Sequence, residues 1–273
     1  MEKHSNDRAL RFYQEVLGLE RLHYGLWRPE DELSLANLKA AQKRYEDLIV
    51  ENLPDRIRSI IDVGCGTGVL LSRLKRMGFQ AEGLTPDRNQ QQLMQAQGLA
   101  PIHHCRFEEF QPQSGYDCVV MSESAQYIPL AGFFGGVRTT LNPGGHLLVC
   151  DYFVLDGARG ILAKSGHNYE CFLKAAQREG FRLAKSRDLT GEVLKTLELA
   201  KVTAEKIRLA LEIGTEKFRD RHPFWTRLIK LFCRKKYLRL QEEMVLIDAQ
   251  EFAKNKTYQF LLFECREVAQ EAS

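Results

Sequence analysis

The sequence has little that would mark a secreted, metal-binding or membrane-spanning protein. Its seven cysteines are scattered and form no CxxC pair or Cys/His cluster with metal-ligand spacing, which disfavours a metal site and a disulfide framework. The N-terminus has no apolar signal-peptide stretch, and no run approaches the ~20 apolar residues of a membrane span. We therefore expect a cytoplasmic protein with reduced cysteines and no bound metal.

The sequence also lacks a clear excess of basic or acidic residues. The 39 basic and 36 acidic residues leave a net charge of +3 on 273 residues. Such a balance gives no overall basic field of the kind that binds nucleic acid, so we expect no nucleic-acid partner. A hydrophobic content of 44% and a charged content of 27% describe an ordinary globular chain.

From residue 54 to residue 191 the hydrophobic pattern alternates between short strands and amphipathic helices. This alternation predicts an α/β fold, a Rossmann-like and mostly parallel sheet with helices on both faces. The predicted strands are 59–63, 79–84, 101–105, 116–121, 145–152 and 181–188, and the predicted helices are 69–77, 87–97, 133–141 and 169–179.

The segment IIDVGCGTGVL at 60–70 reads as a strand, a glycine-rich turn and the start of a helix. Gly64, Gly66 and Gly68 allow positive φ and let a ligand approach the backbone without a Cβ in the way. The next helix offers free N–H groups at its positive end. The spacing is GxGxG and not the GxGxxG of dinucleotide folds, and no P-loop lysine follows. A nicotinamide or nucleoside triphosphate cofactor is therefore disfavoured.

With Asp62 two residues before the first glycine, this segment resembles the first motif of class I S-adenosylmethionine (SAM) methyltransferases. The resemblance implies SAM as the cofactor and S-adenosylhomocysteine (SAH) as its product. It also implies that the loop backbone contacts the methionine part of SAM, while Asp62 orients the loop or the amino group. The loop residues are Gly64, Cys65, Gly66, Thr67 and Gly68.

The ribose and adenine contacts depart from the common pattern. A Rossmann unit usually has an acid ~20 residues beyond the turn, and Thr85 stands there instead. GLTPDRNQ at 83–90 resembles a segment of the mycolic-acid and sterol methyltransferases in which a threonine and a glutamine contact the ribose. We therefore assign Thr85 and Gln90 to the ribose, expect Asp87 to cap the next helix, and expect the backbone N–H of Phe107 near the adenine.

Further segments narrow the resemblance. MSESAQYIP at 121–129, whose Met121 is also assigned to the cofactor, resembles a segment of the tocopherol and sterol side-chain methyltransferases, and LNPGGHLLVCDYF at 141–153 matches their turn into the fifth strand. RHPFWTRLIKLF at 221–232 resembles a stretch of the tocopherol methyltransferases. HYGLW at 23–27 resembles the closing segment of cyclopropane-synthase relatives. The resemblance implies methyl transfer to a lipophilic small molecule, such as a prenylated, sterol-like or terpenoid acceptor.

Four side chains are candidates for the reaction itself. Glu123 lies at the carboxyl end of the fourth strand, at the edge where ligands bind in open α/β sheets. It either faces the substrate or the sulfonium, or it is a helix-capping or solvent-exposed carboxylate. Tyr24, also assigned to the cofactor, and Tyr127 are candidate walls or hydrogen-bond donors, with plain packing as the alternative. His23 is a candidate base, although lone histidines are more often structural. The relatives' Glu-His pair is Gln126-Tyr127 here, which disfavours bicarbonate-assisted cyclopropane chemistry.

Helical segments flank the core at 54–191. Helical spacing over 7–20 and 30–52 predicts that residues 1–53 form a cap over the cofactor. The last stretch, 257–273, begins with a strand pattern and is expected to rejoin the sheet as its seventh strand.

Between core and last strand, residues 192–256 read as a helical insertion with helices over 192–213 and 222–254. The basic stretch at 217–239 carries an apolar stripe. It is either a surface helix with a solvated basic face or a lid over a lipophilic substrate. In the second case its basic face would contact an anionic membrane surface or an anionic head group such as a diphosphate. Two other functions stay open at this point, methylation of oxygen or nitrogen in a polar metabolite and non-catalytic SAM binding.

Overall fold

The computed structural model describes residues 10–222 and 244–266, and one seven-stranded sheet organises them. The strand order is β3-β2-β1-β4-β5-β7-β6, and β7 runs antiparallel to both of its neighbours while the other pairs are parallel. The predicted Rossmann-like, mostly parallel sheet is therefore confirmed. The strands are β1 Ser59–Val63, β2 Gln80–Leu84, β3 Ile102–His103, β4 Tyr116–Ser122, β5 Leu141–Val154, β6 Phe181–Asp188 and β7 Lys256–Cys265.

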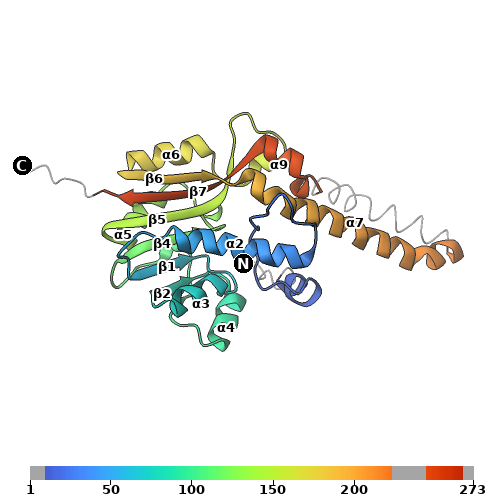
Figure 1. Cartoon of the computed structure of the whole chain (residues 1–273), viewed down its shortest axis with the longest axis horizontal. Helices are drawn as coiled ribbons and strands as arrows, with labels where there is room; N and C mark the ends of the chain where they lie inside the picture. The colour runs from blue at the N-terminus through green and yellow to red at the C-terminus, as the bar shows by residue number, and fades with distance from the viewer. Residues whose placement is uncertain (1–9, 223–243, 267–273) are drawn as a thin grey trace, which may run out of the picture.

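Helices cover both faces of the sheet (Figure 1). Successive strand residues point to opposite faces, so Ile60 joins the core on one side and Ile61 the core on the other. α2, α3, α7 and α9 contribute to the first core, and α5 and α6, through Phe134 and Phe172, to the second. The helices are α2 Leu35–Glu51, α3 Val69–Arg76, α4 Arg88–Ala96, α5 Phe133–Thr140, α6 Tyr169–Arg178, α7 Thr190–Arg221 and α9 Ala249–Asn255.

The N-terminal part is less helical than its spacing predicts. Within the described residues, the expected helix at 7–20 is reduced to a short turn with a π-helical segment, Phe12–Val16. α2 begins at Leu35 and not directly after Pro29, because the Ser34 hydroxyl accepts a hydrogen bond from the backbone N–H of Asn37 (3.2 Å) and starts the helix there.

The insertion also differs from its predicted boundaries. α7 continues to Arg221 and projects beyond the sheet (Figure 1). Most of the predicted second helix and of the basic stretch lies outside the described residues. Its described end is not one continuous helix, because a 3₁₀ turn at Met244–Ile247 precedes Asp248, whose carboxylate caps the short α9. No helix in the described parts of the chain is long and apolar enough to cross a membrane.

Residues 20–27, here called the strap, cross the carboxyl edge of the sheet and are held at several points. The Thr67 hydroxyl donates to the carbonyl of Glu20 (2.6 Å), and the Gln42 amide donates to that of His23 (2.7 Å). At the far end the indole N–H of Trp27 donates to Thr196 in α7 (2.8 Å). The strap therefore ties the glycine turn, α2 and α7 together.

Candidate functional site

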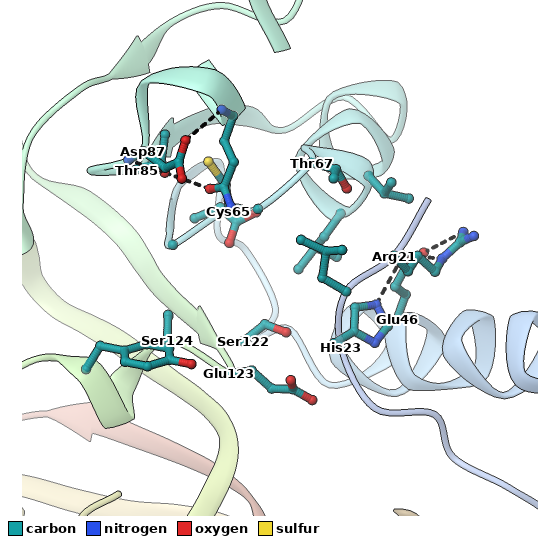
Figure 2. Close-up of a pocket in the computed structure, with 18 of the residues that line it drawn as sticks. Arg21, His23, Glu46, Cys65, Thr67, Thr85, Asp87, Ser122, Glu123 and Ser124 are labelled. Atoms are coloured by element: carbon teal, nitrogen blue, oxygen red, sulfur yellow. Dashed lines mark hydrogen bonds and ion pairs between the residues drawn. The ribbon is translucent and has the colours of Figure 1, made fainter. Parts of the chain in front are cut away.

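A cavity of about 430 Å³ lies at the carboxyl ends of β1, β2 and β4, beside the strap (Figure 2). In Figure 2, Thr85 and Asp87 lie on one side of this space, and Arg21, His23 and Glu46 lie on the other. Most of the predicted site residues line it, namely His23, Asp62, Gly64, Cys65, Gly66, Thr67, Thr85, Gln90, Glu123 and Tyr127.

The other four predicted residues lie outside the cavity wall. Tyr24 contributes its backbone N–H to Glu123. Gly68 starts α3 at a φ of 80°, where a Cβ would come within 2.7 Å of Met94. Phe107 and Met121 are buried in the core, with 6% and 0% of their surface exposed. Their assignment to the cofactor stays a prediction.

The glycine turn is bare on the side of the cavity and crowded behind it. Gly64 has a φ of 74°, and a Cβ built on it would lie 2.4 Å from the Cβ of Ser124. Gly66 has a φ of 54°, lines the cavity, and a Cβ there would meet nothing within 4 Å. The turn therefore offers peptide groups to a ligand without side chains between them.

Asp62 is a buried carboxylate that lacks a partner within the described residues. Only 1% of its surface is exposed, and neither of its oxygens accepts a hydrogen bond. Burial, with a smaller contribution from the charge of Glu46, raises the pKa of Asp62 to about 7. An unpaired buried carboxylate costs several kcal/mol, about what one buried ion loses on leaving water. The site therefore fits a ligand that brings a cationic donor, such as an ammonium group.

The opposite side of the cavity is polar and fixed by local contacts. The Thr85 hydroxyl donates to the amide oxygen of Gln90 (2.8 Å), so these two side chains already lie together. The predicted cap is confirmed, since the Asp87 carboxylate accepts hydrogen bonds from the backbone N–H groups of Asn89 (2.8 Å) and Gln90 (3.2 Å).

An ion-pair cluster that the sequence did not reveal lies between the strap and α2. Arg21 donates to both carboxylate oxygens of Glu46 (2.7 and 3.2 Å), and the Nε2 atom of His23 is 3.6 Å from the nearer one. Burial alone would raise the pKa of Glu46, but His23 and Arg21 hold it below its ordinary value. This cluster fixes the strap against α2 where both line the cavity.

Glu123 is held in an unusual backbone conformation at the end of β4. Its φ of 56° is in the left-handed region, which costs a residue with a Cβ roughly 1–3 kcal/mol. One carboxylate oxygen, Oε1, accepts from the backbone N–H of Tyr24 (2.7 Å) and from the hydroxyl of Tyr258 (2.6 Å). Burial raises the pKa of Glu123 above its ordinary value, although His23 and these two donors lower it in part.

His23 and Tyr127 border the same space in different ways. The His23 ring stacks on Tyr45 at 4.4 Å, and its Nδ1 atom donates to the carbonyl of Tyr24 (2.7 Å). The Nε2 atom is buried and makes no hydrogen bond with the described residues. Tyr127 keeps 78% of its surface exposed. The histidine is thus built into the strap, while the tyrosine is a side chain at the cavity's mouth.

Comparison with known proteins places the chain in a family. The profile of a methyltransferase domain matches residues 38–196. Ubiquinone biosynthesis O-methyltransferase from Ralstonia nicotianae is 23% identical over 208 residues, which are 69% of this chain and 86% of that enzyme. Because the profile matches more than half of the chain, the chain belongs to the methyltransferase domain family.

Solved structures share the fold along almost the whole chain. A protein from Galdieria sulphuraria, assigned as a sarcosine dimethylglycine methyltransferase, superposes with a TM-score of 0.69 at 18% identity, covering 95% of this chain and 99% of that one. Geranyl diphosphate C-methyltransferase from Streptomyces coelicolor gives 0.64 at 16%, covering 92% and 90%. The cyclopropane synthase MmaA2 from Mycobacterium tuberculosis gives 0.65 at 16%, covering 89% and 90%. At such identities the likeness establishes the fold alone.

Together, the family and the site define the class of enzyme. The protein is a SAM-dependent methyltransferase. The residues of the cavity are suited to this cofactor. The carboxylate of Asp62 is buried and no described residue pairs with it, so it suits a ligand's amino group, and the turn at Gly66 has open space beside its backbone. The Thr85–Gln90 pair offers hydroxyl and amide groups suited to a ribose.

Proposed function

We propose that this protein transfers the methyl group of SAM to a small molecule with a lipophilic body, at a carbon or oxygen atom. The observation that carries the proposal is that one cavity is lined both by Asp62, whose carboxylate no described residue pairs with, and by Glu123. The first fits the amino group of a methyl donor. The second fits the acceptor, because it lies at the carboxyl end of β4, where open sheets bind ligands.

The case for a lipophilic acceptor comes from similar proteins, because the aromatic rings nearest Glu123 belong to the core and not to the cavity wall. The ring of Tyr24 lies 5.4 Å from that of Tyr258 and 6.1 Å from that of Phe252, which in turn lies 6.1 Å from Tyr152. Packed in this way, the rings keep water from Glu123 on the side away from the cavity. The names of two similar proteins, a ubiquinone biosynthesis O-methyltransferase and a geranyl diphosphate C-methyltransferase, agree with an acceptor of this kind.

Each residue of the site would have its own role in the reaction. Bound SAM supplies a methyl group on a sulfonium, which is already a good leaving group. Asp62 would hold the amino group, Thr85 and Gln90 the ribose, and the strap would exclude water, so that orientation supplies much of the rate. Glu123 would accept a proton from a hydroxyl acceptor or stabilise the cation that forms on a carbon acceptor.

Transfer of a tritiated methyl group from SAM tests the proposal directly. The acceptor panel contains a prenylated phenol, a prenyl diphosphate and a sterol, and we expect label to enter a lipophilic product. Glu123→Gln should lower this transfer about a hundredfold or more while the Kd for SAH changes little. Glu82→Gln is the matched control, since Glu82 also accepts a tyrosine hydroxyl (2.7 Å) but lies outside the cavity lining. Full activity of Glu123→Gln would remove Glu123 from the mechanism.

A second candidate function is methylation of nitrogen in a polar amine. The cavity wall favours it in one respect, because Glu46, Asp62, Asp87 and Glu123 all line it and would attract a cation. The sarcosine dimethylglycine enzyme shares the fold. Adding sarcosine and dimethylglycine to the panel separates the two functions, since label found only in these amines would overturn the lipophilic acceptor.

A further inference from the structure

The hydrogen bonds around Glu123 leave its two carboxylate oxygens in different situations. Oε1 accepts from the backbone N–H of Tyr24 and from the hydroxyl of Tyr258, at 2.7 and 2.6 Å. Oε2 accepts no hydrogen bond from the described residues. One oxygen is therefore fixed by the protein, and the other is left for a ligand in the cavity that Glu123 lines.

The Tyr258 hydroxyl has one proton and two neighbours, so its donor direction can be worked out. It lies 2.6 Å from Glu123 and 3.2 Å from the hydroxyl of Tyr45. Tyr45 in turn donates to the carbonyl of Cys150 (3.1 Å) and lies 3.0 Å from the hydroxyl of Ser122. The shorter, charge-assisted bond to the carboxylate takes the proton of Tyr258. With the proton of Tyr258 on Glu123 and that of Tyr45 on the Cys150 carbonyl, no proton lies between the two tyrosine oxygens, so Tyr258 is the tyrosine that holds the carboxylate.

The two tyrosines come from parts of the chain far apart in sequence, and Tyr258 is the one that bonds to Glu123. Tyr45 is fully buried in α2, and Tyr258 is fully buried in β7, opposite Tyr152 of β5. Burial of both hydroxyls keeps water from replacing these hydrogen bonds. The backbone of Glu123 is in the left-handed region and donates its N–H to the carbonyl of Cys150 (2.9 Å). This hydrogen bond fixes the backbone from which the side chain extends.

We propose that Tyr258 is a positioning residue that fixes Oε1 of Glu123 and so presents Oε2 alone to the methyl acceptor. This inference rests on the proposed function, in which Glu123 faces that acceptor. Asn, Gln or a solvated Glu at this place could not offer one bound and one free oxygen in a set orientation. The acceptor must therefore bind in one orientation, in which its proton or its developing charge faces Oε2 of Glu123.

Other titratable groups around Glu123 must be considered in any pH experiment. These groups lie on every element packed against Glu123. Among them, Tyr24 and Tyr258 supply the hydrogen bonds that the Glu123 carboxylate accepts. The groups are Tyr13, His23, Tyr24, Tyr45, Tyr127, Cys150, Asp151, Tyr152 and Tyr258.

The test is a ¹³C NMR titration of the Glu123 carboxyl in the free protein, assigned with Glu123→Gln. Tyr258→Phe removes a donor to the ionised form, so the titration midpoint should rise by about one pH unit. Tyr116→Phe is the matched control, because it removes a similar bond to Glu82 (2.7 Å) and should leave the Glu123 midpoint unchanged. A folded Tyr258→Phe protein with an unchanged midpoint would overturn the inference.

If Tyr258→Phe does not fold, the wild-type protein supplies the second measurement. The hydroxyl proton of Tyr258 should give a downfield, slowly exchanging NMR signal that moves as Glu123 titrates, and its absence would overturn the inference. Neither measurement needs the acceptor. Failure to bind SAH would therefore refute the proposed function, whereas an unmoved midpoint in a protein that binds SAH refutes the role of Tyr258 alone. Once an acceptor is known, Tyr258→Phe should lower kcat about tenfold with the SAH Kd unchanged.

Discussion

The two ends of the cavity are built in different ways. The proposed cofactor end comes from one βαβ unit, in which Asp62, the glycine turn and Thr85 lie close together in sequence. The proposed acceptor end brings Glu123 together with Tyr24 and Tyr258, which lie 99 and 135 residues away along the chain. A local motif therefore builds the first end, and tertiary packing builds the second.

The carboxylates at the two ends also differ. Asp62 has no hydrogen-bond partner among the described residues, while Glu123 has two strong donors on one oxygen. An unpaired buried carboxylate fits a cationic ligand, and a held carboxylate fits a reaction that needs one defined atom. Substitutions at the cofactor end should therefore change affinity for SAM, and substitutions at the acceptor end should change turnover.

The largest effect is expected at Gly64. In Gly64→Ala the new Cβ would lie 2.4 Å from Ser124 at a φ of 74°, so we expect a loss of about 2–4 kcal/mol of stability and at least a hundredfold weaker SAH binding. Gly98→Ala is the control, because it has the same φ of 74° but nothing within 4 Å. Calorimetry and thermal melting check both, and equal behaviour of the two variants would contradict the steric account.

Asp62→Asn should separate binding from stability. It removes the charge that fits the cofactor's ammonium group, so SAH should bind ten- to a hundredfold more weakly, while the melting temperature should hold or rise because an unpaired buried charge is lost. Asp117→Asn should do the opposite. Asp117 accepts from the backbone N–H groups of Arg58 (2.7 Å) and Ser59 (3.0 Å), away from the cavity. If both variants lost stability and kept affinity, Asp62 would be structural.

The pH dependence of binding should follow Asp62. Its pKa in the folded protein, about 7, lies above its ordinary value of 3.8, so the folded state keeps a proton that the unfolded chain releases between these values. Its contribution to stability therefore falls as pH rises through this window. Affinity for SAM changes in the opposite direction, decreasing about tenfold for each pH unit below 7. A pH series of titrations, with Asp62→Asn as reference, checks the direction of both pH dependences, that of stability and that of affinity for SAM. A flat affinity profile would contradict them.

The smallest effect is expected where the strap meets the glycine turn. Thr67→Val keeps the shape of the side chain but removes the hydrogen bond to the Glu20 carbonyl (2.6 Å), which is worth about 1 kcal/mol. SAH should then bind about fivefold more weakly, with faster dissociation in stopped-flow measurements. Thr139→Val is the control, since its hydroxyl bonds within α5. An unchanged dissociation rate would mean that the strap does not retain the cofactor.

The local pattern predicted most of the fold. β1 and β6 have the predicted boundaries, although only β1 is a short apolar run; β6 is polar and exposed after Phe181, and the turn at Gly180 marks its start. The continuous helix expected through residue 254 was wrong at its described end, where Asp248 caps a new helix. Its carboxylate, followed by Glu251 three positions later, is a start signal that outweighs helical periodicity. The turn at 12–16 is short because its residues pack little, none of them being buried.

The site was predictable only where its residues share a motif. The turn and Thr85 follow from spacing, whereas Glu46, Tyr45 and Tyr258 belong to α2 and β7, which carry no local signal for a ligand. Their roles depend on which strands and helices the fold brings together. The positive φ of Glu123 could not be predicted either, since the chain gives no glycine or asparagine there to mark it.

Titration calorimetry of SAM and SAH with the wild-type protein at pH 8 tests the central claim most directly. The account predicts that one molecule of either ligand binds per chain, because the bare turn contacts the shared adenosyl and amino acid parts and Asp62 is ionised. A folded protein that releases no heat with either ligand at any pH near neutrality would contradict it.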